Sequence, residues 1–551
     1  MNKITLVFLI VCTQTIFGYA KITQTEKLAA TCKVWGFLKY YHPTVASGKI
    51  NWDEKLFEVL PKIEKVQTKE EFSSVIEKWI ESLGEVPANT PAALDPKTDY
   101  FTKNLNLEWT QKDKLFSKSL SQKLKFITEN RFQGVNYYVN QEGKNVRLQF
   151  VNEPEYADFK WTDKNLRLLA LFRFWNYIEY FFPYKYVMDQ NWDEALMEIL
   201  PHIDTPASEK EFLLAMREIS IKLNDTHAGT TSPDMIKYLG GEKYIPFTAK
   251  FINDKAVIVA IANDSLAKID DLRIGDIITK VDGSTVAQQL AELSKYMQGS
   301  NKAVATYLGG FIMFTGDTDD LEIEFIRDNV TSTKKIHRYP NEKIKRSPPK
   351  KTAKWEIMAD NIGFVRMSKV PKEEVAKMME ELKGTQAIIF DARSRPINTD
   401  FLVSEYLNSE RKPILRLLQQ DLSYPGRYYF RNDMEECGKS NPDYYKGKVV
   451  VLVGSGTHSF GEQTVMSLQT APNVTIVGTQ TSGSDGPNYE FSIINGFDSS
   501  FTSMGVFYPN KKETQRIGIV PDIKVIPTIL GAQQGKDEVF DRALLFVKTG
   551  K

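Results

Sequence analysis

The chain has 551 residues, of which 42% are hydrophobic and 26% charged, and its formal net charge at pH 7 is +1. A chain of this length is divided into several domains, and this composition excludes a disordered or fibrous protein. The near-zero net charge argues against nucleic acid as the main partner, because nucleic-acid-binding proteins carry a basic excess.

The first twenty residues have a charged start at Lys3, an apolar stretch from Ile4 to Val11, and a cleavage-site pattern, Gly18-Tyr19-Ala20, with small residues at its first and last positions. This pattern predicts a secretory signal peptide, residues 1–20, cut after Ala20. A membrane anchor needs a longer apolar run of roughly 18 to 20 residues. A lipoprotein acylated at Cys12 needs a small residue where Val11 stands. We therefore expect an exported, periplasmic or extracellular protein that is not an integral membrane protein after cleavage.

Two cysteines, Cys32 and Cys437, follow the predicted signal peptide. They are too few for a disulfide framework, and they offer no metal-ligand spacing. We expect no metal ion and no cofactor.

A segment near the N-terminus recurs further along the chain, because residues 33–63 and 173–203 share their aromatic, proline and Asn-Trp-Asp positions. The aligned pairs are Trp35 with Trp175, Pro43 with Pro183, Trp52 with Trp192, and Pro61 with Pro201. Both copies carry apolar residues at helical spacing, which predicts two helical modules. We assign residues 21–100 and 161–240 to the repeats, and residues 101–160 to a linker with a β-hairpin.

The two copies differ at a chemically capable residue, because Pro87 of the first stands opposite His227 of the second. A duplicated scaffold that differs in this way suggests that one copy is a support and the other carries function. The alternative is that His227 is an ordinary loop histidine.

Short strand patterns follow over residues 241–340, with the motif LRIGDIITKVDG at residues 272–283. The motif predicts a tight turn at Gly275 and Asp276, a strand, and a hairpin turn at Asp282 and Gly283. It resembles the signature of a PDZ domain, a class of domain that binds extended peptides by adding a strand to a sheet edge. The alternative is an unrelated β-hairpin.

The next segment, residues 341–354, is basic and contains Pro348 and Pro349, which is typical of a linker. Beyond it, residues 355–545 alternate buried strands with helical segments and predict an α/β domain. The expected strands are residues 361–367, 387–391, 449–454 and 474–478. The predicted fold class is therefore a multidomain α+β protein.

Ser459 follows one of these strands and a short polar loop, and it precedes a helical segment. A serine there exposes its hydroxyl near the first amides of a helix, which can stabilise a developing oxyanion. The alternative is a helix N-cap, with Glu462 as the partner in a capping box.

Three further motifs surround Ser459: AIIFDARSRP at residues 387–396, NVTIVGTQTSG at 473–483 and GIVPDIKV at 518–525. With the PDZ-like segment ahead of them, they resemble the C-terminal-processing (tail-specific) protease family in order and spacing. The resemblance covers residues 244–543. It implies a ClpP/crotonase-like α/β domain with Ser459 as the nucleophile.

Common bacterial members of that family use a Ser-Lys dyad, but Ser484 stands in the place of the lysine here. No lysine lies between Lys448 and Lys511, so a different base must activate Ser459. The tricorn-like branch of the family takes a histidine from a helical domain ahead of the PDZ module, and this implies His227 as general base. His458 is the competitor, although adjacent side chains on a loop usually diverge.

The remaining site residues rest on the same resemblance. Gln515 stands where the branch has a supporting glutamate, and an amide cannot stabilise imidazolium by charge. The third member therefore stays open, and the further candidates are Asp225, Glu462 and Asp485. The oxyanion hole is expected to use the amide of Phe460 and one from the loop that ends at Ile397, where the family's Gly-Gly pair is replaced.

The sequence thus predicts an exported serine-type endopeptidase that hydrolyses extended or C-terminal peptide segments of peptides or unfolded proteins. The PDZ-like domain would capture the chain for hydrolysis. The main alternative is a catalytically inactive peptide- or ligand-binding homologue on the same fold, and a hydrolase of small esters or amides is a third possibility.

Overall fold

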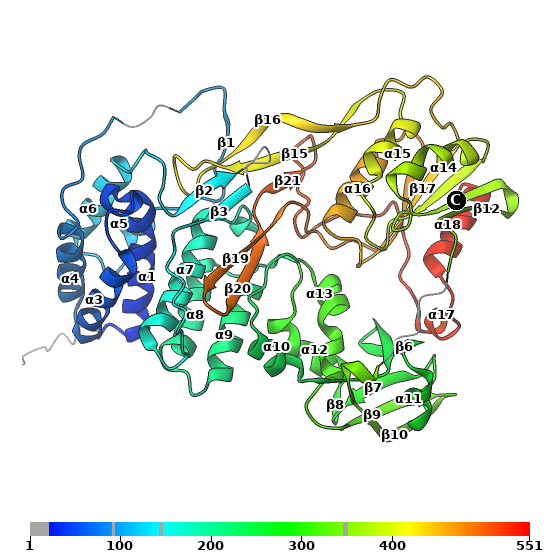
Figure 1. Cartoon of the computed structure of the whole chain (residues 1–551), viewed down its shortest axis with the longest axis horizontal. Coiled ribbons are helices and arrows are strands. Elements are labelled where there is room, and N and C mark those ends of the chain that lie inside the picture. The colour runs from blue at the N-terminus through cyan, green and yellow to red at the C-terminus, as the bar shows by residue number, and fades with distance from the viewer. Residues whose placement is uncertain (1–20, 91–93, 143–146, 345–350) are drawn as a thin grey trace, which may run out of the picture.

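The structure is a computed structural model, and it describes residues 21–90, 94–142, 147–344 and 351–551. The predicted signal peptide lies outside the described residues, as do residues 143–146 of the predicted hairpin and residues 345–350 of the predicted linker. Figure 1 shows a helical part on the left, a small β-rich part at the lower right, and an α/β part at the upper right.

The helical part contains two groups of helices separated by a short hairpin. The elements are α1 (Gln24–Tyr41), α2 (Pro43–Ala46), α3 (Trp52–Lys65), α4 (Lys69–Glu81), α5 (Trp109–Lys112), α6 (Lys118–Glu129), β2 (Val139–Glu142), β3 (Arg147–Phe150), α7 (Lys164–Phe181), η1 (Lys185–Val187), α8 (Trp192–Asp204), α9 (Glu209–Ile221) and α10 (Pro233–Gly240). Helices α1 and α7 are buried nearly all round, so they form the centre of this part.

The same tryptophan contact occurs in both groups. In the first, the indole N–H groups of Trp35 and Trp52 donate to each other's backbone carbonyls at 3.5 and 3.0 Å. In the second, Trp175 and Trp192 do the same at 3.1 Å in both directions. The predicted duplication would produce this recurrence, and the duplication itself stays a prediction.

The β-rich part is an antiparallel sheet in the order β10-β9-β7-β6-β5, with β8 paired to β7. Its elements are β4 (Lys243–Tyr244), β5 (Phe247–Ile252), β6 (Lys255–Ile261), α11 (Asp264–Ile269), β7 (Ile277–Val281), β8 (Ser284–Thr285), α12 (Val286–Leu293), η2 (Ser294–Tyr296), α13 (Lys302–Gly309), η3 (Gly310–Phe314), β9 (Asp320–Arg327), β10 (Val330–His337) and β11 (Tyr339–Pro340). The predicted turn between β7 and β8 is present, with positive φ angles of 46° at Asp282 and 79° at Gly283.

The α/β part is built on a sheet in the order β12-β13-β14-β17-β18-β22, and every pairing after the first is parallel. Its elements are η4 (Asn341–Lys343), β12 (Trp355–Met358), η5 (Ala359–Asn361), β13 (Ile362–Arg366), η6 (Lys372–Glu374), α14 (Val375–Leu382), β14 (Ala387–Asp391), α15 (Asp400–Leu407), β17 (Lys448–Val453), α16 (Phe460–Leu468), β18 (Val474–Gly478), β22 (Ile523–Lys524), α17 (Ile529–Gln533) and α18 (Glu538–Thr549). Separate apolar cores cover the two faces, one with α14 to α16 and one with α18.

Two antiparallel ribbons extend from the α/β part toward the helices (Figure 1). Their elements are β15 (Lys412–Gln420), β16 (Tyr428–Cys437), β19 (Asn488–Ile494), β20 (Phe497–Thr502) and β21 (Gly505–Phe507). Strand β16 pairs with β1 (Asp99–Phe101) from the N-terminal half of the chain. The β19–β20 ribbon shares an apolar core with the helical part, so it brings segments distant in sequence to one place.

Candidate active site

Ser459 lies between β17 and α16 with a φ of 52° and a ψ of −124°. Positive φ is strained for a residue with a side chain, and a sharp strand-to-helix turn of this kind exposes a nucleophilic hydroxyl. The Ser459 side chain makes no capping hydrogen bond to the helix. Ser459 thus occupies the N-cap position of α16 but does not cap the helix through its side chain, and the predicted capping box with Glu462 is wrong.

Glu462, one turn into α16, is buried and fastens a neighbouring loop to this helix. Its carboxylate accepts hydrogen bonds from the Thr481 hydroxyl and from the amides of Gly483 and Ser484, the latter two at 2.7 and 2.9 Å. Burial raises the pKa of Glu462 in spite of these hydrogen bonds. Glu462 thus fixes the loop that leads to Ser484.

His227 and Ser459 meet at Ser484, the residue in the place of the family's lysine. The Ser484 carbonyl accepts from the Ser459 amide at 2.9 Å, and the Ser484 hydroxyl lies 3.3 Å from Nδ1 of His227. The structure thus brings the predicted nucleophile and the predicted base to one residue. No hydrogen bond joins their two side chains among the described residues.

Asp225 is buried, with 2% of its surface exposed, and its carboxylate accepts hydrogen bonds from polar groups that surround His227. Its Oδ1 accepts from the hydroxyls of Ser484 at 2.8 Å and Thr502 at 2.9 Å, and its Oδ2 accepts from the Thr502 amide at 2.8 Å. The Thr502 hydroxyl also lies 2.8 Å from Nδ1 of His227. Asp225 does not bond the imidazole itself, and two hydroxyls stand between them.

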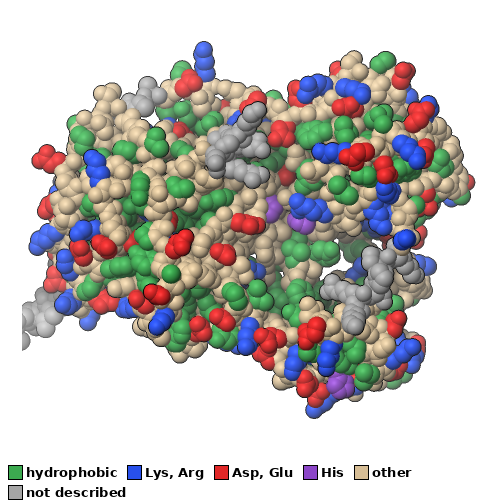
Figure 2. All heavy atoms as spheres, viewed as in Figure 1, with side chains coloured by type: hydrophobic (Ala, Val, Ile, Leu, Met, Phe, Trp, Pro, Cys, Tyr) green, Lys and Arg blue, Asp and Glu red, His purple; other side chains and the backbone are tan. Residues whose placement is uncertain are grey.

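The pKa of His227 is lowered, first because the ring is withdrawn from water, although the Asp225 carboxylate opposes this. Electrostatic interactions with the Arg395 guanidinium and with the neighbouring His458 ring lower the pKa of His227 further. In Figure 2, histidine side chains gather near the middle of the face, beside a basic side chain. A half-buried imidazole with a lowered pKa is neutral near pH 7 and able to accept a proton.

The other predicted site residues lie nearby in different roles. His458 is half-buried, and its Nδ1 lies 3.2 Å from the Gly456 carbonyl. No hydrogen bond joins it to the Ser459 side chain among the described residues, and it stays the alternative base. Gln515 is buried and donates to Asp225 at 3.4 Å, one residue removed from the imidazole. Asp485 accepts from the Gly486 amide at 2.7 Å, and burial raises its pKa well above the ordinary value.

The two predicted oxyanion donors differ. The Phe460 amide, at the first position of α16, has no hydrogen-bond acceptor among the described residues. The Ile397 amide donates to the Met367 carbonyl at 3.4 Å, so in this conformation it is turned toward Met367. Phe460 thus remains a candidate donor, and Ile397 needs a local rearrangement to act as one.

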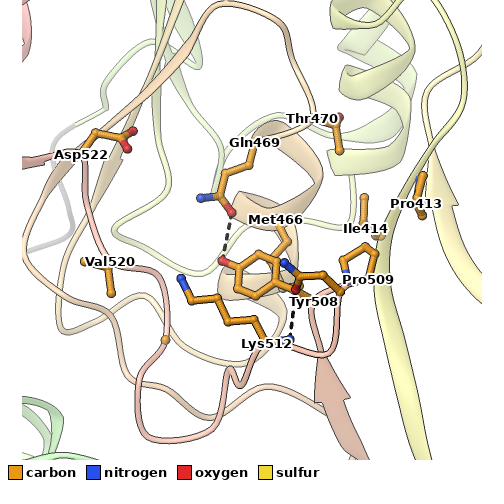
Figure 3. A pocket seen from close by; sticks show the side chains of 12 residues that line it. Pro413, Ile414, Met466, Gln469, Thr470, Tyr508, Pro509, Lys512, Val520 and Asp522 are labelled. Carbon is orange, nitrogen blue, oxygen red and sulfur yellow. Dashed lines mark hydrogen bonds between the residues drawn. The ribbon is translucent and has the colours of Figure 1, made fainter. Parts of the chain in front are cut away.

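A cavity of about 450 Å³ lies elsewhere in the α/β part (Figure 3). It is lined by Met466 in the second half of α16, by Gln469 just after this helix, and by the segment with Tyr508 and Lys512. Tyr508 donates to the Gln469 side chain at 3.2 Å across it. Neither Ser459 nor His227 lines this cavity, so it is separate from the candidate active site.

Among the residues that the structure describes, no group of three or more His, Cys, Asp or Glu side chains is arranged to hold a metal ion. Within the same part of the chain, no helix combines the length and apolarity that a membrane span requires.

Comparisons with known proteins identify two domains in the chain. Residues 361–525 match the model of peptidase family S41, and residues 257–307 match that of the PDZ domain. The chain therefore carries an S41 peptidase domain and a PDZ domain, and it is a homologue of the carboxy-terminal-processing proteases. This confirms the family resemblance and the mixed α/β multidomain architecture, whereas the tricorn-like branch and the ClpP/crotonase-like type stay predictions.

A carboxy-terminal-processing protease of Bartonella bacilliformis is 23% identical over 299 residues, which are 52% of this chain and 62% of the relative. This chain thus spans less than two thirds of that relative's length. Among solved structures, mature CPAF complexed with lactacystin is 14% identical with a TM-score of 0.55, and the match covers 70% of this chain and 99% of CPAF. A second structure of mature CPAF has a TM-score of 0.54 with 14% identity, over 70% of this chain and 98% of CPAF. These structures show likeness of fold alone.

Thr502 is the site residue that the sequence did not indicate. It ends a strand, carries no motif, and is separated from His227 by 275 positions along the chain. The ribbon in which β20 lies had no place in the predicted α/β alternation, so no sequence signal led to it.

Proposed function

We propose that this S41-family chain is an exported serine peptidase that cleaves extended or C-terminal peptide segments, with Ser459 as nucleophile and His227 as general base. The observation that carries the proposal is the shared contact at Ser484, which holds the Ser459 backbone and the His227 ring in one site. A strained serine and a neutral, half-buried histidine that share one neighbouring residue fit nucleophilic catalysis.

In the first half of the reaction, Ser459 attacks the scissile carbonyl while His227 takes the hydroxyl proton. The negative charge that develops on the carbonyl oxygen is stabilised by the Phe460 amide and the N-terminal end of α16. His227 then gives the proton to the leaving amine, and the C–N bond breaks. The first product leaves, and the acyl group stays on Ser459.

In the second half, water takes the place of the amine. His227 removes a proton from the water as it attacks the acyl carbon, and it returns that proton to Ser459 as the ester bond breaks. The products are a free carboxylate and the original serine. No metal ion or redox step enters this sequence.

Substrate delivery is assigned to the PDZ domain. Strand β5 is an edge of its sheet and pairs with β6 alone among the described strands. An extended peptide can add to such an edge through its backbone. From the same domain, Tyr307 of α13 reaches the nucleophile loop. Its hydroxyl lies 3.0 Å from the point where a Cβ would stand if Gly456 carried a side chain. This contact supports a route from the PDZ domain to Ser459.

Fluorogenic unstructured peptides, with either a free or an amidated C-terminus, test this function. The Ser459→Ala variant should lose hydrolysis while keeping its fold, and Ser455→Ala, a serine on the same loop, should keep it. A preference for the free carboxylate supports tail-directed cleavage. Equal peptide binding by the wild type and Ser459→Ala without turnover by either would instead establish the inactive binding homologue.

The branch of the family, the location of the protein and its partners belong to the same proposal. We place the chain in the tricorn-like Ser-His branch because the lysine of the other branch is absent and His227 takes the basic role. Export to the periplasm or cell exterior rests on the pattern of residues 1–20. The partners are peptides or unfolded proteins.

A further inference from the structure

We propose that Asp225, Thr502 and Ser484 together take the part of the acid that the family's site has and this chain lacks. Asp225 orients the two hydroxyls, and the hydroxyls hold His227 with its proton on Nδ1 and with Nε2 free for Ser459. This inference rests on the proposed peptidase function. The three are positioning residues, because each acts through the imidazole.

The direction of each hydrogen bond follows from Asp225. A carboxylate only accepts hydrogen bonds, and Oδ1 of Asp225 lies 2.8 Å from the Ser484 hydroxyl and 2.9 Å from the Thr502 hydroxyl. Each hydroxyl has one proton, and each donates it to Asp225. Both oxygens therefore face His227 with lone pairs alone.

The tautomer of His227 is fixed in turn. Its Nδ1 lies 2.8 Å from the Thr502 oxygen and 3.3 Å from the Ser484 oxygen. Two acceptors on one side of a neutral ring require the proton to be on that nitrogen. Nε2 is then the basic nitrogen, as removal of the serine proton demands.

Two hydrogen bonds to the backbone of His227 hold the residue that carries the ring. The His227 amide donates to Asp225 at 3.1 Å, and the Ser500 hydroxyl donates to the His227 carbonyl at 2.6 Å. Asp225 also brings a negative charge near the ring, which favours the imidazolium that forms during the reaction. An acid one hydroxyl away can thus stabilise this cation without touching it.

Gln515, at the place of the family's glutamate, takes part differently. Its amide donates to Asp225 at 3.4 Å, and its carbonyl oxygen is buried without a hydrogen-bond partner among the described residues. The amide therefore contacts the acid instead of serving as the acid. The departure from the family pattern at Gln515 is compensated by Asp225.

Thr502 offers the sharpest variants, because its amide holds Asp225 independently of its hydroxyl. Thr502→Val removes the hydroxyl and keeps the shape, whereas Thr502→Ser restores the hydroxyl. We expect kcat to fall about 10-fold in Thr502→Val and about 10²-fold in the double variant with Ser484→Ala, with KM little changed. Thr502→Ser should recover most of the loss.

The tautomer is measured without any substrate. In full-length protein labelled with ¹⁵N-histidine, with the His227 signal assigned from its loss in His227→Gln, two-bond ¹H–¹⁵N spectra should show a protonated Nδ1 and an unprotonated Nε2. The double variant and Asp225→Asn should lose this preference. If Asp225→Asn fails to fold, Thr502→Val and the double variant decide the matter.

The possible results separate the two proposals. A proton on Nε2 in the wild type, or unchanged kcat in the double variant of an active enzyme, overturns the positioning role. A protonated Nδ1 that is lost in the double variant supports the role even if no peptide is hydrolysed, and in that case the proposed function fails alone.

Discussion

His227 is surrounded by charges of both signs, and this makes its basicity adjustable. Asp225 favours the protonated ring, while His458 and Arg395 disfavour it. Because burial is the largest influence and acts in the same direction as Arg395 and His458, the net shift of the His227 pKa is downward. The imidazole is active as a base only when neutral, so activity should persist below the ordinary pKa of histidine, about 6.5.

Arg395→Gln removes one of the charges that keep the ring neutral. A lost positive charge makes protonation of His227 easier, so its pKa rises, and the acidic limb of the kcat/KM profile should move to higher pH. The profile measured from pH 4 to 9 checks this, and Arg411→Gln, an exposed arginine elsewhere in the α/β part, serves as the control. An unchanged acidic limb in Arg395→Gln would show that another group governs it.

Asp400 at the start of α15 is a second unusual acid. Only 1% of its surface is exposed, and neither carboxylate oxygen makes a well-formed hydrogen bond among the described residues. Burial raises its pKa to about 6, although the nearby amides of Asp400 and Phe401 oppose this shift. The folded protein holds this proton more tightly than the unfolded chain does. Stability contributed by the protonated acid is therefore lost as the pH rises from about 4 to about 6.

Asp400→Asn replaces the acid with a neutral group of the same shape. At pH 7 we expect the variant to be more stable than the wild type by up to about 3 kcal/mol, and near pH 4 the two should be alike. Denaturant unfolding at the two pH values measures the difference. A variant less stable than the wild type at pH 7 would mean that the carboxylate has partners that compensate for its burial.

Among single residues, the sequence indicated those with a local context and missed those without one. Ser459 was readable from a strand, a loop and a helix in order, and His227 from the contrast between two repeats. Thr502 was not readable, because a hydroxyl at the end of a strand has no signature of its own. Its role depends on a hydrogen bond across the fold.

At the level of helices and strands, the segment between α12 and α13 ties the PDZ domain to the loop that carries His227 and to the loop that leads to Ser484. Ser300 accepts from the Thr226 amide at 2.8 Å through its side chain, beside His227. The Asn301 side chain donates to the carbonyls of Thr481 at 2.9 Å and Ser482 at 2.8 Å. One short segment of the PDZ domain therefore contacts both the loop of His227, the proposed base, and the loop that leads to Ser484.

Asn301→Asp tests this connection. The aspartate can still cap α13, where Asn301 now accepts from the Val304 amide at 3.1 Å, but it cannot donate to the two carbonyls. We expect kcat to fall several-fold, roughly the effect of losing one or two hydrogen bonds, with the melting temperature little changed. Asn263→Asp, which alters the cap of α11 in the same domain, is the matched control. Equal kcat in Asn301→Asp and the wild type would show that the loops do not depend on this contact.

The strands of the parallel sheet were predictable from sequence because their buried apolar runs are continuous, and they occur as β13, β14, β17 and β18. The ribbons β15–β16 and β19–β20 were not predicted. Apolar residues of these ribbons pack against helices that are distant in sequence. The local sequence pattern therefore does not show against which part of the chain the ribbons pack. Tertiary packing settles that placement.

For the molecule as a whole, the proposed site is assembled from three parts. The helical part supplies His227, the α/β part supplies Ser459, and the β19–β20 ribbon brings Thr502 to His227. Phe491 of this ribbon packs its ring edge-on against Tyr177 at 5.3 Å and Phe150 at 5.2 Å. The ribbon is thus anchored by aromatic contacts in the helical core.

Phe491→Ala removes that anchor. We expect a loss of about 3–5 kcal/mol in the free energy of unfolding, and a fall in kcat at temperatures where the protein is still folded. Phe540→Ala removes a comparable ring contact, with Phe364 at 5.0 Å, on the far face of the sheet. That control should lose stability without losing kcat per folded molecule. Equal kcat in Phe491→Ala and Phe540→Ala would contradict the dependence of catalysis on the anchored ribbon.

Covalent labelling by a fluorophosphonate, followed by peptide mapping, reports most directly on a nucleophilic serine activated by a histidine that is distant along the chain. The wild type and His458→Ala should be labelled on Ser459 at similar rates, and His227→Ala should react at least about 10²-fold more slowly while remaining folded. A label on another serine, or equal rates in His227→Ala and the wild type, would contradict Ser459 and His227 as the reacting pair.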